Sequence, residues 1–65
     1  MITRDFFLND CFEMRQLLNK ITKSIPCFTK GDMLEMSIYR FRISCREEDF
    51  GWVKKTLKKF TNIVQ

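Results

Sequence analysis

An alternating run near the middle of the chain constrains its fold more than any other segment. Its odd positions are apolar and its even positions polar: Tyr39, Phe41, Ile43 and Cys45 alternate with Arg40, Arg42, Ser44 and Arg46. Period-two alternation is typical of a β-strand that buries one face and leaves the other in water. Such a strand needs a second layer over its apolar face. The run therefore predicts a sheet that is covered on one side.

The strongest turn signal in the chain is Lys30-Gly31-Asp32, which predicts a hairpin. Residues 27–29 form one of its strands, and the run from residue 33 to residue 46 forms the other. Early in that run the apolar residues fall on even positions instead: Leu34, Met36 and Ile38. The buried face is therefore expected to change sides near Ser37, through a β-bulge or a sharp twist.

An amphipathic segment before the hairpin predicts a helix. Its apolar residues recur at alternating intervals of three and four: Cys11, Met14, Leu18, Ile21 and Ile25. Asp10 and Glu13 resemble a capping box at its start, and Pro26 forbids its continuation. The helix is therefore expected over residues 10 to about 25.

A second amphipathic segment follows the alternating run. Its apolar stripe consists of Phe50, Val53, Leu57, Phe60 and Val64. Three acidic residues, Glu47, Glu48 and Asp49, precede the stripe, and four lysines lie toward its end, so the charges at both ends suit the helix macrodipole. Helix-start electrostatics explains the acidic residues better than metal binding does, because consecutive residues on a helix point in different directions.

The remaining segment, residues 2–8, fits either a short strand or an earlier start of the first helix near Thr3, because Phe7 continues the helical spacing. The predicted fold class is α+β: a small two-layer domain with two helices on one face of an antiparallel sheet, in the order αββα or βαββα. The second order resembles a ferredoxin-like fold without its last strand, a topological likeness that implies no function. Residues 1–65 are expected to form a single domain, because so short a chain cannot divide its core.

Neither catalysis nor cofactor binding is indicated by the composition. The chain has no histidine, so it lacks the usual general base at neutral pH and the commonest zinc ligand. Cys11, Cys27 and Cys45 lack the close spacing of ordinary zinc sites, and Cys45 is expected to be a packed core thiol. The two glycines stand apart from any phosphate-loop pattern. We therefore predict that the protein is not an enzyme and binds neither a metal nor a cofactor.

The cysteines also bear on the compartment. Their odd number and wide spacing do not suit a disulfide framework and indicate a reducing environment. The first eight residues carry Arg4 and Asp5 within an apolar stretch, so they do not predict a signal peptide. No apolar run approaches the ~20 residues that cross a bilayer. We expect a cytoplasmic location and no membrane span.

The net charge of +4 is concentrated in two stretches that contain no acidic residue. The first holds Arg40, Arg42 and Arg46, which are expected to share one strand face at intervals of about 6 to 7 Å, a spacing that suits phosphates. The alternative is a merely solvated face. Tyr39 and Phe41 lie on the opposite face, which weakens a comparison with RNA-stacking sheets.

The second stretch places Lys54, Lys55, Lys58 and Lys59 on the second helix. Helical spacing puts Trp52 beside Lys55 and Lys59, either as a widening of the buried band or as an aromatic anchor for a partner. Phe12 of the first helix likewise falls far from the apolar stripe, as a lone exposed residue or as a second anchor.

These features favour a binding protein. The leading hypothesis is a small regulatory or inhibitory module that docks on a larger protein with an acidic surface and itself forms a homodimer, of the sort that phages and mobile elements encode against a host protein. Its candidate binding residues are Arg40, Arg42, Arg46, Trp52, Lys55, Lys59 and Phe12. The alternative is a nucleic-acid-binding regulator that uses the arginines and lysines on phosphates.

Overall fold

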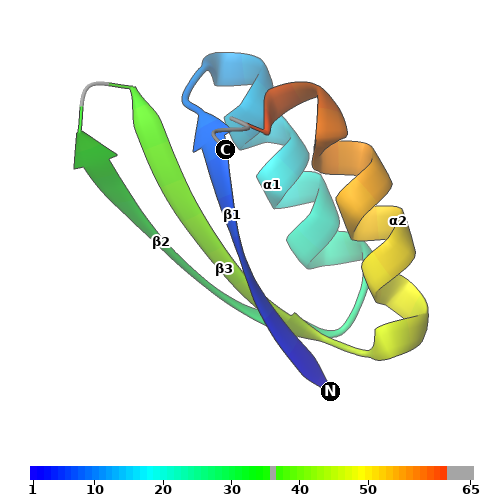
Figure 1. Cartoon of the computed structure of the whole chain (residues 1–65). Helices are drawn as coiled ribbons and strands as arrows, with labels where there is room; N and C mark the ends of the chain where they lie inside the picture. Colours follow the sequence, from blue (N-terminus) through cyan, green and yellow to red (C-terminus); the bar gives the residue numbers. More distant parts are fainter. Residues whose placement is uncertain (36, 62–65) are drawn as a thin grey trace.

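The computed structural model describes residues 1–35 and 37–61, which form three strands and two helices (Figure 1). The elements in chain order are β1 (Ile2–Asn9), α1 (Phe12–Ser24), β2 (Cys27–Glu35), β3 (Ile38–Cys45), α2 (Glu47–Leu57) and the 3-10 helix η1 (Lys58–Phe60). Both helices lie on the same side of the antiparallel sheet. The predicted α+β class is confirmed, and the first segment is a strand, so the order is βαββα.

Strand β3 is the centre of the sheet, and the strand order is β1-β3-β2. Its pairing with β1 runs from Ile2 opposite Cys45 to Asn9 opposite Ile38. Beyond η1, Thr61 forms an antiparallel bridge with Leu8. The described residues thus form a three-stranded antiparallel sheet in which β1 and β2 flank β3.

The predicted turn at Lys30-Gly31-Asp32 is wrong, because these residues lie inside β2 and pair with β3. The chain reverses between Glu35 and Ile38 instead. The change of buried face that was expected near Ser37 therefore falls at the connection between two strands and not within one strand. A register shift does occur, but in β2, between Met33 and Glu35. Met36, one of the three apolar residues at even positions that led to this expectation, lies outside the described residues.

Gly31 has a packing role rather than a turn role. A Cβ atom at this position would collide with the ring and hydroxyl of Tyr39, which lies over it from β3. The guanidinium of Arg15 sits on the same ring, 5.0 Å from its centroid. A glycine inside a strand can serve to let an aromatic side chain approach the backbone closely. The segment around it then resembles a turn in its residue types although it is part of a strand.

Helix α1 starts two residues later than predicted, and Cys11 caps it. The Cys11 Sγ accepts a hydrogen bond from the Met14 N–H at 3.4 Å. Asp10 instead binds Arg15 at 2.8 Å through its carboxylate and donates its backbone N–H to the Ser37 carbonyl at 2.7 Å. A side chain other than the expected one thus satisfies the first turn of the helix.

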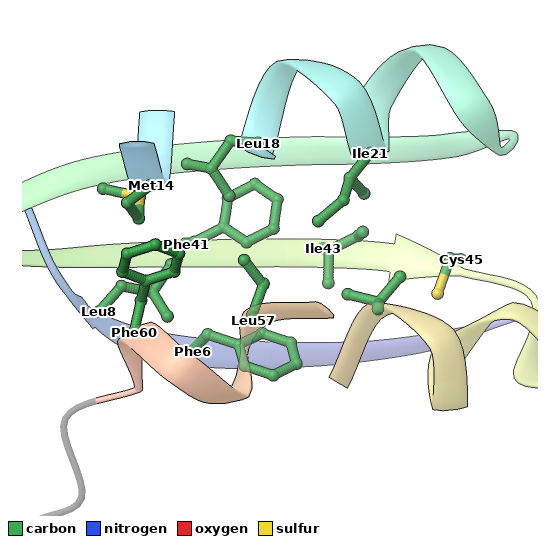
Figure 2. Close-up of a cluster of buried hydrophobic side chains, with 11 residues drawn as sticks. Phe6, Leu8, Met14, Leu18, Ile21, Phe41, Ile43, Cys45, Leu57 and Phe60 are labelled. Carbon is green, nitrogen blue, oxygen red and sulfur yellow. The ribbon is translucent and has the colours of Figure 1, made fainter. Parts of the chain in front are cut away.

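The core lies between the helices and two of the three strands (Figure 2). Its members are Phe6, Leu8, Met14, Leu18, Ile21, Phe41, Ile43, Cys45, Val53, Leu57 and Phe60. The predicted stripes are confirmed for the interior of both helices, whereas Cys11 is exposed, Ile25 and Phe50 are only half-buried and Val64 lies outside the described residues. Strand β2 contributes nothing to this buried set, so the ladder to β3 is what chiefly holds it.

Helix α2 is shorter than its stripe predicts. It ends at Leu57, and the 3-10 turn η1 carries Phe60 into the core before Thr61 becomes extended. Among the described residues, no helix has the length and apolar character needed to cross a membrane.

Candidate binding surfaces

No polar or charged residue of the described part of the chain is buried, so every candidate site is a surface feature. Within residues 1–35 and 37–61, no group of three or more Cys, Asp or Glu side chains is placed to hold a metal ion. Two surfaces stand out, one on the sheet and one on α2.

The first surface is the side of the sheet that the helices leave uncovered, here called the open sheet face (Figure 1). The strand pleat assigns its residues, because Phe6, Leu8, Phe41 and Ile43 point into the core and their neighbours must point outward. The open sheet face consists of Thr3, Asp5, Phe7 and Asn9 on β1, Ile38, Arg40, Arg42 and Ser44 on β3, and Phe28, Lys30 and Asp32 on β2.

The arginines of this face are held by carboxylates from both neighbouring strands. Arg42 forms two hydrogen bonds with Asp5 of β1, at 2.7 Å from Nε and 3.2 Å from Nη2. Arg40 donates from Nη2 to Asp32 of β2 at 2.8 Å. These hydrogen bonds lower the pKa of both carboxyl groups and raise the pKa of the Arg42 guanidinium. The predicted basic strand face is therefore largely neutralised.

Arg46 does not belong to this face, contrary to expectation. It follows the last residue of β3 and occupies the N-cap position of α2. Its Nε donates to Asp49 at 2.9 Å, its Nη1 lies 3.4 Å from Glu48, and the hydrogen bond to Asp49 raises its pKa. Two of the three acidic residues that start α2 thus neutralise the third predicted binding arginine.

The open sheet face also carries two aromatic residues that the sequence analysis missed. Phe7 lies opposite Arg40 and is 43% exposed, and Phe28 lies opposite Ser44 and is 73% exposed. The sequence does place Tyr39 and Phe41 of β3 on the other side, but neighbouring strands supply their own outward aromatics. Adjacent Phe6 and Phe7 were the available signal, since in a strand one of the two must point outward.

The second surface, here called the lysine surface, consists of Trp52, Lys54, Lys55, Lys58 and Lys59 on α2 and η1. All five residues are exposed, and Trp52 retains 39% of its accessible area. Trp52, Lys55 and Lys59 recur at intervals of three and four, which places them along one side of the helix.

Ion pairing in the described part of the chain is limited to arginines, although Arg4 forms no ion pair. Every ion pair in residues 1–35 and 37–61 uses an arginine: Arg15, Arg40, Arg42 or Arg46. None of the seven lysines forms one there, although Lys59 lies 5.5 Å from the centroid of the Phe60 ring. The cationic side chains without an ion-pair partner in the described residues are therefore Arg4 and the seven lysines, and four of these lysines lie on the lysine surface.

Phe12 is exposed, as both of its predicted readings require. It is the first residue of α1, and 76% of its area is accessible. Helices α1 and α2 run in opposite directions, so α1 starts at the end of the helical layer where η1 lies (Figure 1). Phe12 thus belongs to the same end of the molecule as Lys58 and Lys59.

Comparisons with known proteins add no functional assignment. No protein-family model matches the sequence, and neither the curated proteins nor the solved structures give a match.

Proposed function

We propose that the protein is a small non-enzymatic binding module, regulatory or inhibitory in its effect, that docks on an acidic surface of a larger protein through its lysine surface. The observation that carries this proposal is the placement of four exposed lysines on α2 and η1, of which Lys55 and Lys59 share a side with the exposed Trp52, with no acidic ion-pair partner among the described residues. Unbalanced charge of one sign steers a partner of the opposite sign. An exposed tryptophan supplies the kind of anchor that dominates interface energies.

The lysine surface is electrostatically costly in the isolated protein, which supports a binding role. Lys54 and Lys58 are four residues apart, as are Lys55 and Lys59, and like charges at this helical spacing destabilise by roughly 0.2 to 0.5 kcal/mol per pair. Carboxylates of a partner relieve this repulsion. The four cations also lie toward the end of α2, where the helix dipole offsets part of this repulsion.

The arrangement favours a protein partner over a nucleic acid. Nucleic-acid affinity grows with the number of neutralised phosphates, and binders with strong salt dependence contact about six to ten. The lysine surface spans roughly 12 Å of helix and offers four cations. Arg40 and Arg42 cannot enlarge this footprint, because they lie on the uncovered side of the sheet and already hold Asp32 and Asp5.

Homodimerisation belongs to the same proposal and uses the open sheet face. That face combines Lys30 and two arginines with Asp5 and Asp32, so a second copy can approach it without strong like-charge repulsion. Phe7 and Phe28 supply apolar contact area. The cytoplasmic location and the phage or mobile-element inhibitor role against a host protein are further parts of the proposal.

Affinity capture followed by reconstitution tests the docking surface. The tagged chain is used to capture proteins from the native host, and the affinity of each purified candidate is then measured by calorimetry. We expect an acidic protein whose binding is lost with Lys55→Glu/Lys59→Glu. It should persist with Lys20→Glu/Lys23→Glu, a matched double reversal at two exposed lysines of α1.

Two results would contradict the proposal. One is equal loss of affinity with both double variants, since that indicates a response to overall charge alone. The other is capture of nucleic acid only, with an affinity that falls with salt by about one power per contacted phosphate.

A further inference from the structure

The fold brings together two cysteines that the sequence separates by 18 positions. Cys27 is the first residue of β2 and Cys45 the last of β3, and the register places them directly opposite each other. Opposed residues of antiparallel strands have Cα atoms about 4.5 to 5.5 Å apart, which lies within the range that a disulfide bridges. Both are free thiols in the structure.

Both side chains point to the same side of the sheet. Cys45 is fully buried and belongs to the core, and Cys27 is partly buried and packs against that core. Burial raises the pKa of each thiol, and the pKa of Cys27 is raised further by the nearby Cys45. The two sulfur atoms therefore share one environment, and Cys27 is the residue of the pair that solvent can reach.

We infer that Cys27 and Cys45 form an oxidation site at which hydrogen peroxide converts the two thiols into a cross-strand disulfide. The Cys27 thiolate attacks the peroxide oxygen, the O–O bond breaks, and a sulfenic acid and water form. The Cys45 thiolate then displaces the sulfenic hydroxyl, which leaves as a second water after taking up a proton. In total, two thiols lose two protons and two electrons, and the peroxide is reduced to two waters.

The consequence of this bond follows from the weak anchoring of β2. That strand contributes no residue to the buried core and is held mainly by its ladder to β3. A covalent link between the two strands closes the chain from residue 27 to residue 45 and lowers the entropy of the unfolded state. Oxidation therefore fixes the edge strand that carries Phe28 and Lys30, whereas in the reduced protein this strand is held mainly by the ladder.

Cys11 is not part of this pair. It follows Asn9, which lies opposite Ile38, whereas Cys45 lies opposite Ile2 at the other end of the sheet. Seven strand residues separate the two ends, a distance of roughly 23 Å. Because Cys11 is exposed, it reacts independently and would complicate the test. Cys11→Ser removes this thiol while leaving an oxygen that can cap α1.

The test treats the Cys11→Ser protein with hydrogen peroxide and maps the cysteine peptides by mass spectrometry. We expect a monomer with a mass loss of about 2 Da, one disulfide between Cys27 and Cys45, and no alkylatable thiol until a reductant is added. The Tm should rise by roughly 10 °C, and the amides of β2 should exchange more slowly. The additional Cys27→Ser change should abolish the mass loss and the Tm shift.

Other oxidation products overturn the inference. If mapping finds Cys27 and Cys45 both still reduced, individually converted to sulfinic acid, or joined between two chains, the opposed thiols are not a disulfide site. A disulfide that forms without slowing the exchange of β2 amides contradicts the proposed consequence for that strand.

Discussion

The open sheet face and the lysine surface are both basic in the sequence, but the fold neutralises only one of them. On the sheet, Arg40 and Arg42 hold carboxylates of the neighbouring strands at 2.8 and 2.7 Å. On α2 and η1, four exposed lysines have no ion-pair partner among the described residues. The charge of a sequence segment therefore does not measure the charge that a partner meets.

The difference has a geometric cause. An antiparallel register places side chains of distant segments opposite each other, and the planar guanidinium of arginine matches a carboxylate in two contacts. Asp5 is 37 residues from Arg42, yet it is the residue directly across the strand. On a helix the neighbours lie three and four residues away, and for Lys54 and Lys55 the residues four positions ahead are lysines as well.

Removal of the aromatic anchor tests which surface binds, and we expect it to have the largest effect. Trp52→Ala should weaken binding of the acidic partner by roughly 30-fold, about 2 kcal/mol, because a buried interface anchor is lost. Phe28→Ala, the matched change on the open sheet face, should leave that affinity within about twofold. Calorimetry with the purified partner measures both, and circular dichroism confirms folding. The reverse ranking would assign the binding role to the sheet.

Substitution of the two glycines tests the stability of the elements that carry the two surfaces, β2 for the open sheet face and α2 for the lysine surface. Gly31→Ala should destabilise the protein by about 2 kcal/mol, because the added methyl group collides with Tyr39. Gly51→Ala should stabilise it by about 0.5 to 1 kcal/mol, because an exposed helical position next to Trp52 gains helix propensity and has nothing within 4 Å. Urea denaturation measures both free energies of unfolding. A neutral Gly31→Ala change would show that Tyr39 can move aside.

Removal of the carboxylates that pair with Arg40 and Arg42 tests whether this pairing limits the binding of nucleic acid by the open sheet face. Asp5→Asn/Asp32→Asn removes both carboxylates and leaves Arg40, Arg42 and Lys30 on one face. The affinity for single-stranded DNA at low salt should rise by about tenfold, because about two more phosphates can be neutralised. Fluorescence anisotropy measures the change, with Glu13→Gln/Glu47→Gln as a control of equal charge. An equal gain in the control would show that net charge alone decides.

Residue periodicity predicts the scaffold well, because it reflects contacts that any core must make. The interval of three and four identifies Met14, Leu18 and Ile21 as buried, and alternation identifies Phe41 and Ile43. It fails where a specific tertiary partner decides. Gly31 lies in a segment whose residue types are typical of a turn. Its lack of a side chain instead leaves room for the ring of Tyr39, eight residues later. The start of α1 fails similarly, because Cys11 takes the capping role expected from Asp10.

The two candidate surfaces also differ in how well the sequence predicts them. Local sequence is enough to predict the lysine surface and the exposure of Phe12, since helical spacing is a local property. The open sheet face required the strand register, because Phe7, Phe28, Asp5 and Asp32 come from strands other than the one that carries the arginines. Sequence reasoning that considers one strand at a time therefore finds the cations and misses their partners.

The acid response of stability is the smallest effect and isolates the ion pairs of the sheet. Hydrogen bonds from Arg42 and Arg40 lower the pKa of Asp5 and Asp32 below the ordinary value of 3.8. A carboxyl group whose pKa is lower in the folded state stabilises the fold above its unfolded pKa, and this contribution disappears as the pH falls through the folded value. Stability should therefore fall below about pH 4.

Comparison of variants separates this contribution from general acid unfolding. Because both carboxylates are at the surface, the effect is limited to a few degrees of Tm between about pH 5 and pH 2. Asp5→Asn/Asp32→Asn should show a smaller loss of Tm over this range than the unchanged protein, whereas Glu13→Gln/Glu47→Gln should not. If the three proteins lose the same Tm, the cross-strand pairs orient the arginines without stabilising the fold. Neutralisation of the open sheet face would then matter for binding alone.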